Sequence, residues 1–105
     1  MKYVKIGETQ MPVNFGMGAL MEFEKQRGQN VLALLKDGNL SITDAVTVVY
    51  VAFLNGCKKD KRQVDFDLEK VADWLDETPG LFDIVMEEVA ASMVQKKKED
   101  EPGKK

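Results

Sequence analysis

The feature that most constrains this sequence is an almost continuous apolar run over residues 45–54, interrupted only by Thr47 and Tyr50. Ser41 and Asp44 stand just before it, in the spacing of a capping box at the start of a helix. Asn55-Gly56 follows it and predicts the end of that helix. The β-branched residues of the run also suit a buried strand, but the capping signals favour a central helix buried on most sides. Since 105 residues build only one core, the remaining elements must pack around this segment.

Two helices are predicted before the apolar run. The first covers residues 16–27 and stops at Gly28, a residue suited to the left-handed backbone that ends many helices. Asn30 can cap a shorter helix over residues 31–36, which ends before Gly38. The apolar side of the first helix is predicted to consist of Met17, Leu20, Met21 and Phe23.

Two further helices are predicted after the run. Asp67 is the expected N-cap of the first, whose apolar residues form one stripe. Thr78 then caps the last helix, with Pro79 at its first position, and this helix extends to Lys97. Residues 98–105 are charged and carry proline and glycine, so we expect a disordered tail.

The N-terminal segment predicts a β-hairpin. Residues 2–6 alternate in polarity, residues 7–9 suit a turn, and residues 10–15 read as the returning strand, with Pro12 on an edge or at an unpaired position. Two strands alone are marginally stable, so the hairpin must pack on the helices or gain another strand, within the monomer or from a second copy. The predicted fold is mainly α: residues 1–97 form a single small domain of about five helices, with the hairpin within residues 1–15.

The residues that perform most enzyme chemistry are scarce. The chain has no histidine, the commonest general base and zinc ligand, and Ser41 and Ser92 therefore lack a histidine partner. The acidic groups at 65–67 and 73–77 read as solvated helix or loop surface rather than as a metal site. We therefore predict no enzymatic activity, no cofactor and no metal.

Charge and cysteine content constrain partners and compartment. Fifteen basic and eighteen acidic residues give a net charge of −3, which disfavours a nucleic-acid-binding protein. The basic segment at 58–62 has no interleaved aromatic residue and reads as a solvated loop. No apolar run is long enough for a membrane span, and the N-terminus lacks the apolar core of a signal peptide. The single cysteine, Cys57, excludes an internal disulfide, so we expect a reducing, cytoplasmic setting.

The last helix and the tryptophan carry the candidate partner-binding residues. Apolar side chains cover about half the circumference of residues 81–93, which fits either a core reached from two sides or a face awaiting a partner, with the core favoured. Trp74 reads as a lid over the core edge, or else as an interface anchor. The methionines at 17, 21, 86 and 93 read as core fillers, although flexible thioethers also suit an adaptable binding surface. The candidates are Trp74, Phe82, Met86, Val89 and Met93.

Several segments together resemble the tail assembly chaperones of long-tailed phages and prophages, over about residues 5–95. The strongest likenesses are FGMGAL-x-EFE at residues 15–24 and VADWLDE-x-P at residues 71–79, with GCKK at residues 56–59 between them. Their order and spacing carry the resemblance, which no single segment would support.

This resemblance implies a function and its partners. Members of that family are small helical proteins of the host cytoplasm that keep the long tape-measure protein soluble, recruit tail-tube subunits around it, and leave before the tail is complete. The resemblance therefore implies a non-enzymatic chaperone that binds the tape-measure protein and the tail-tube protein. The alternative is a structural component of a phage tail or related particle that is retained after assembly.

Overall fold

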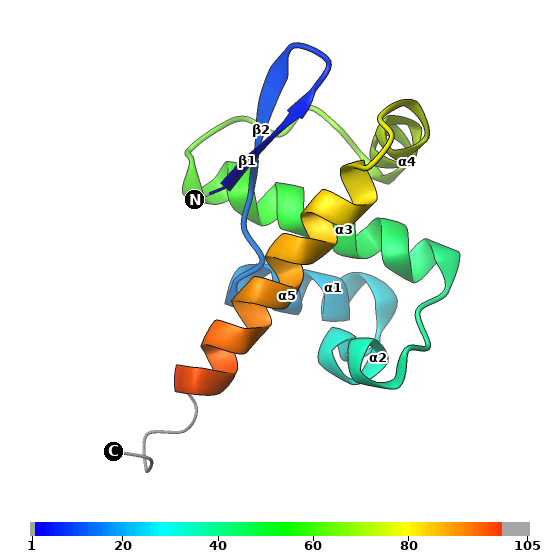
Figure 1. Ribbon diagram of the computed structural model, residues 1–105, viewed down its shortest axis with the longest axis vertical. Coiled ribbons are helices and arrows are strands. Elements are labelled where there is room, and N and C mark those ends of the chain that lie inside the picture. Colours follow the sequence, from blue (N-terminus) through cyan, green and yellow to red (C-terminus); the bar gives the residue numbers. More distant parts are fainter. Residues whose placement is uncertain (1, 100–105) are drawn as a thin grey trace.

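The computed structural model describes residues 2–99, and the side chains of residues 2–92. It confirms the predicted fold class: within this described part of the chain, five helices follow an N-terminal antiparallel hairpin (Figure 1). In chain order the elements are β1 (Lys2–Ile6), β2 (Thr9–Val13), α1 (Met17–Arg27), α2 (Val31–Asp37), α3 (Ile42–Lys59), α4 (Leu68–Glu77) and α5 (Leu81–Glu99).

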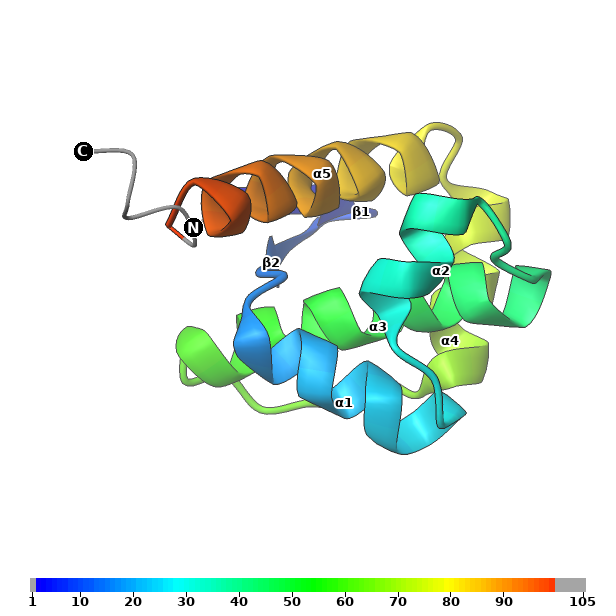
Figure 2. The ribbon, with the colours of Figure 1, turned by 90° about the horizontal axis from the view of Figure 1, so that it is seen from below.

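The apolar run forms the middle of α3, and α3 is the centre of the fold. It contacts α1, α4, α5 and β2, and it runs between α5 on one side and α1 on the other (Figure 2). Val48, Val49, Val51 and Phe53 of α3 are fully buried. The helical interpretation of residues 45–54 is therefore confirmed, because a segment enclosed by other elements needs apolar side chains on most of its circumference.

The predicted end of this helix at Asn55-Gly56 is wrong, because α3 continues to Lys59. Gly56 lies against the backbone of β2, where an added Cβ would meet the carbonyl oxygen of Pro12 and lie 2.5 Å from its carbonyl carbon. The side chain of Asn55 donates hydrogen bonds to the carbonyl oxygen (3.2 Å) and the side-chain oxygen (2.7 Å) of Asn14. Both residues therefore join α3 to the hairpin instead of ending the helix.

Three predicted helix starts are confirmed by their side-chain caps. The Asn30 side chain accepts from the N–H of Leu32 (2.9 Å), and the Asp67 side chain accepts from the N–H of Lys70 (2.9 Å). Ser41 and Asp44 form the predicted capping box at the start of α3. Each cap satisfies backbone N–H groups that the first helical turn leaves without an intrahelical partner.

The boundaries of the last helix differ from those predicted. Thr78 ends α4 and does not cap α5, and Pro79 lies in the turn before Leu81. Gly80 adopts a φ of 84°, which directs the chain out of this turn and into α5. At the other end α5 extends to Glu99, so residues 98 and 99 are helical. The remainder of the predicted tail, residues 100–105, lies outside the described residues.

A partly buried ion pair joins α1 to the start of α3. Arg27 donates a hydrogen bond to the Asp44 carboxylate at 2.7 Å, and only 6% of the Asp44 side chain is exposed. This bond, together with those of the capping box, holds the pKa of Asp44 below its ordinary value, against the opposing effect of burial. A carboxyl group with a lower pKa in the folded state stabilises the protein above its unfolded pKa, and this contribution is lost as the pH falls through the folded pKa.

We expect Asp44→Ala to lower the free energy of unfolding by about 2–3 kcal/mol at pH 7, since it removes a cap and a charge-assisted hydrogen bond. The difference from the unchanged protein should begin to shrink below about pH 4, the ordinary pKa of an aspartate, and should disappear only below the lower pKa that Asp44 has in the folded protein. Urea denaturation at several pH values measures both effects. The exposed carboxylate of Asp73 offers a control, because Asp73→Ala should change stability little at any pH. An equal cost of Asp44→Ala at neutral and strongly acidic pH would contradict the electrostatic part of this account.

Candidate partner-binding surface

Trp74 lies at the edge of the core. Its ring centroid is 5.3 Å from that of Phe66 and 6.0 Å from that of Phe53, and the side chain is half-buried. The Phe53 ring meets it edge-on, an arrangement that aromatic quadrupoles favour. These contacts support the reading of Trp74 as a lid that closes the core between α3 and α4.

The candidates on α5 do not share one surface. Val89 is 1% exposed and lies in the core with Leu81 and Val85, so no partner can contact it in this conformation. Met86 is half-buried and packs against the core, whereas Phe82 is 38% exposed. The side chain of Met93 lies outside the described residues. The broad apolar circumference of α5 therefore divides into a buried line and two exposed flanks, with Phe82 on one flank and Ile84 on the other.

Among the described side chains, two strongly exposed methionines lie on α1, where the sequence predicted core residues. Met17 is 63% and Met21 is 66% exposed, while Ala19 and Phe23 of the same helix are fully buried. The predicted apolar side containing Met17 and Met21 is therefore wrong for these two residues. Small residues explain the orientation: Gly18 lies close to Asn55 of α3, and Ala19 adds only a methyl group to the contact, so this side of α1 packs closely on α3. The pairing of Gly18 with Ala19 is the sequence signal that could have revealed this orientation.

Hollows lie on both sides of the exposed methionines. A groove of about 220 Å³ between α1 and α2 is lined by both methionines and Leu32, and Leu32 is itself 38% exposed. On the other side of Met21, a depression of about 400 Å³ is bordered by Lys25 and Lys58. We call Met17, Met21 and Leu32, with these two hollows, the α1 face.

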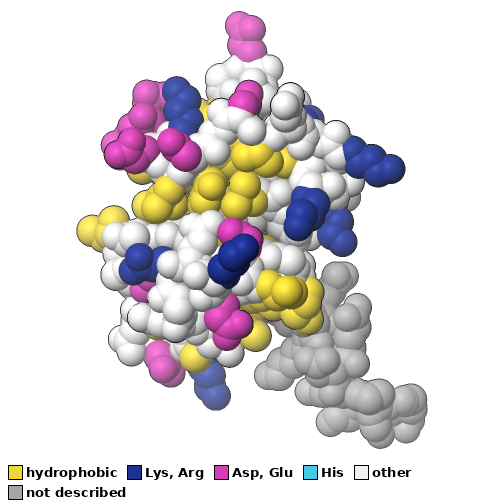
Figure 3. All heavy atoms as spheres, turned by 180° about the vertical axis from the view of Figure 1, so that it is seen from behind, with side chains coloured by type: hydrophobic (Ala, Val, Ile, Leu, Met, Phe, Trp, Pro, Cys, Tyr) yellow, Lys and Arg dark blue, Asp and Glu magenta, His cyan; other side chains and the backbone are white. Residues whose placement is uncertain are grey.

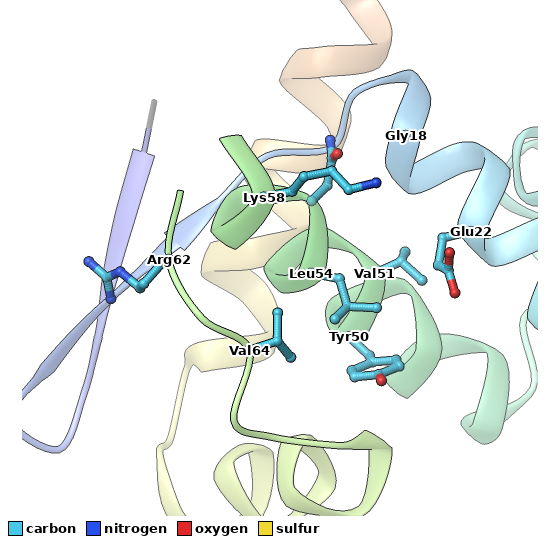
Figure 4. Close-up of a pocket in the computed structure, with 9 residues that line it drawn as sticks. Gly18, Glu22, Tyr50, Val51, Leu54, Lys58, Arg62 and Val64 are labelled. Carbon is cyan, nitrogen blue, oxygen red and sulfur yellow. The ribbon is translucent and has the colours of Figure 1, made fainter. Parts of the chain in front are cut away.

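A third and larger groove, of about 510 Å³, continues from the α1 face between α1, α3 and the loop over residues 60–67. Figure 4 shows Tyr50, Val51 and Leu54 of α3 between Glu22 of α1 and Val64 of the loop. Hydrophobic side chains also gather visibly on the side of the molecule turned away from the viewer of Figure 1, with acidic and basic side chains around them (Figure 3). The chain thus presents apolar surface outside its core, bordered by charges.

Tyr50 and Cys57 of α3 both have pKa values above their ordinary ones. Burial, with the nearby carboxylates of Glu22 and Asp67, raises the pKa of the Tyr50 hydroxyl, which therefore stays protonated. Burial also raises the pKa of the Cys57 thiol, which contacts the sulfur of Met11 at 3.9 Å inside the core. A thiol in such a place is a poor nucleophile. The described side chains, those of residues 2–92, include no cluster of metal-ligating groups, and the structure over residues 2–99 contains no helix long and apolar enough to cross a membrane.

The arrangement is suited to binding an apolar surface of another protein. Lys25, Lys58 and Glu24 border the α1 face and make no ion pair with any described residue, so they are available to a partner. Exposed methionines provide apolar contact area that adapts to the shape of a partner.

Comparison with known proteins identifies no relative of this chain: no family model matches it, and neither a curated protein nor a solved structure is significantly similar to it.

Proposed function

We propose that this protein is a non-enzymatic phage tail assembly chaperone that binds the tape-measure protein in the host cytoplasm and helps to recruit tail-tube subunits. The proposal rests on the sequence resemblance described above and on one structural observation. That observation is the exposure of Met17 and Met21, each by more than 60%, on a helix whose other side is fully buried.

The physical requirement of such a chaperone fits the α1 face. Tape-measure proteins are long and helical, and before the tube encloses them their apolar stripes would associate with one another. A transient chaperone has to cover these stripes and then be displaced. The α1 face is shallow, and Met17, Met21 and Leu32 offer only a limited apolar area. Binding is therefore weak enough to reverse. An amphipathic helix laid along the α1–α2 groove would bury its apolar residues against these side chains.

Co-expression with the tape-measure protein encoded in the same genome tests this function. We expect the unchanged chain to raise the soluble fraction of that protein severalfold and to co-purify with it. The double variant Met17→Asp, Met21→Asp should abolish both effects, because each aspartate places a charge where the partner helix contributes apolar surface. Since both positions are largely exposed, the variant should keep the helical circular dichroism and melting temperature of the unchanged protein.

Two matched variants locate the effect. Ile42→Asp replaces an apolar residue that is 85% exposed at the start of α3, outside the α1 face, and should leave co-purification unchanged. Phe82→Asp tests the exposed flank of α5 that carries Phe82. Loss of binding in Phe82→Asp alone would place the interface on α5. Failure of the unchanged chain to solubilise the long protein would contradict the chaperone function, and fixed stoichiometry in purified particles would favour a retained structural component.

A further inference from the structure

The outer edge of β2 is closed by the protein itself. Gly7 and Glu8 form a two-residue turn between the paired residues Ile6 and Thr9. Along each strand, every second residue counted from this turn therefore points its backbone N–H and C=O groups away from the other strand. On β2 these residues include Gln10 and Pro12. The carbonyl oxygen of Gln10 accepts a hydrogen bond from Arg62 at 2.7 Å. Pro12 has no N–H to offer, and its carbonyl group packs against α3. No further strand can join the hairpin on this side.

The outer edge of β1 is open. The same alternation directs the N–H and C=O groups of Tyr3 and Lys5 away from β2, since these residues face Pro12 and Gln10 in the register. No described residue forms a hydrogen bond with these outward backbone groups. The turn of the hairpin projects beyond the helices (Figure 1). An open edge next to a closed one on a two-stranded sheet is a template for one additional strand.

We infer that β1 pairs with β1 of a second copy of this chain, in an antiparallel register centred on Val4, to give a four-stranded sheet across a twofold axis. In this register Tyr3 of each copy lies opposite Lys5 of the other, and the outward backbone groups of both residues are hydrogen-bonded in both copies. Lys5 never lies opposite Lys5, as it would in a register centred on that residue. The pairing is a property of this edge and does not depend on the proposed function.

Charge complementarity favours a second copy as the occupant. The register brings Lys2 of one copy opposite Ile6 of the other, next to the turn that carries Glu8. Both Lys2 and Glu8 are exposed and without an ion pair among the described residues. The Tyr3 hydroxyl donates to the Asp60 carboxylate at 3.0 Å, which places a negative charge near the approaching Lys5. Twofold symmetry makes each of these contacts twice.

Sedimentation equilibrium over a range of concentrations, up to about 1 mM, tests the pairing. Since one short strand from each copy buries much less than about 1,200 Å² in total, we expect a concentration-dependent change from 11.8 kDa to twice that mass. Lys5→Pro should keep the protein monomeric, because it removes an outward N–H and blocks the edge while leaving the bonds between β1 and β2 intact. Gln10→Pro is the matched control: it makes the same change at the residue paired with Lys5, on the closed edge, and should dimerise like the unchanged chain.

Charge variants test the register without altering the backbone. Glu8→Lys should weaken dimerisation about fivefold, because two favourable pairs become repulsive. Adding Lys2→Glu to this variant should restore it. A protein that stays monomeric throughout, or a Lys5→Pro dimer as strong as that of the unchanged chain, would overturn the proposal. If Lys5→Pro unfolds, the charge variants decide: equal dimerisation of the unchanged chain and Glu8→Lys would contradict the Val4-centred register.

Discussion

Phe53→Ala is expected to lower the free energy of unfolding by about 4 kcal/mol, the largest effect of any single substitution considered for this protein. The Phe53 side chain is fully buried in α3, and its ring meets those of Phe66 and Trp74 edge-on, with centroids 6.3 Å and 6.0 Å away. The substitution removes the buried ring, leaves a cavity beneath Trp74 and ends both aromatic contacts. Because a domain of this size is stable by only about 5–15 kcal/mol, urea denaturation should show a much lower midpoint.

Phe53→Leu provides the comparison, since it keeps most of the volume and should cost less than half as much. Trp74 is the only tryptophan in the chain, so its fluorescence reports directly on this contact. We expect its emission to move to longer wavelength in Phe53→Ala and to change little in Phe53→Leu. Equal costs for the two variants would contradict the contribution of the cavity, because both variants lose the aromatic contacts and only Phe53→Ala leaves a large cavity.

Gly56→Ala is expected to destabilise the protein by about 3 kcal/mol, although alanine is the better helix former by about 1 kcal/mol. The added methyl group would lie 2.5 Å from the carbonyl carbon of Pro12 and 2.9 Å from the N–H nitrogen of Val13. These are backbone atoms of the hairpin, which cannot move aside as a side chain can. The hairpin must therefore separate from α3, and the buried contacts of both are weakened. Thermal unfolding measures the loss.

Gly18→Ala is the matched substitution in α1. Its added methyl group would lie 2.5 Å from the side-chain oxygen of Asn55, which can rotate away at the expense of its hydrogen bonds to Asn14. We therefore expect a smaller cost, about 1 kcal/mol. A Gly56→Ala protein as stable as the unchanged chain would show that the hairpin is not held against α3 by this close approach.

The candidate surface was less predictable than the fold. The sequence drew attention to Trp74 and to α5, because large apolar residues are concentrated there, but Val89 is in the core and Trp74 closes its edge. The exposed methionines of α1 were expected to be buried. A helical wheel identifies which residues share a side of a helix, but on α1 apolar residues occupy both sides, so the wheel alone does not say which side faces the core.

Local chemistry allowed the sequence by itself to determine the number of helices, the caps at Asn30, Ser41 and Asp67, and the position of the hairpin. Each of these depends on residues within one turn of a helix or one pair of strands. Only the tertiary structure decided that Gly56 lies inside α3 and that Met17 and Met21 face outward. It also decided that β2 is closed while β1 is open. These features depend on contacts between segments far apart in the sequence, such as Pro12 with Gly56 and Gln10 with Arg62, and a local pattern carries no information about which distant backbone will approach it.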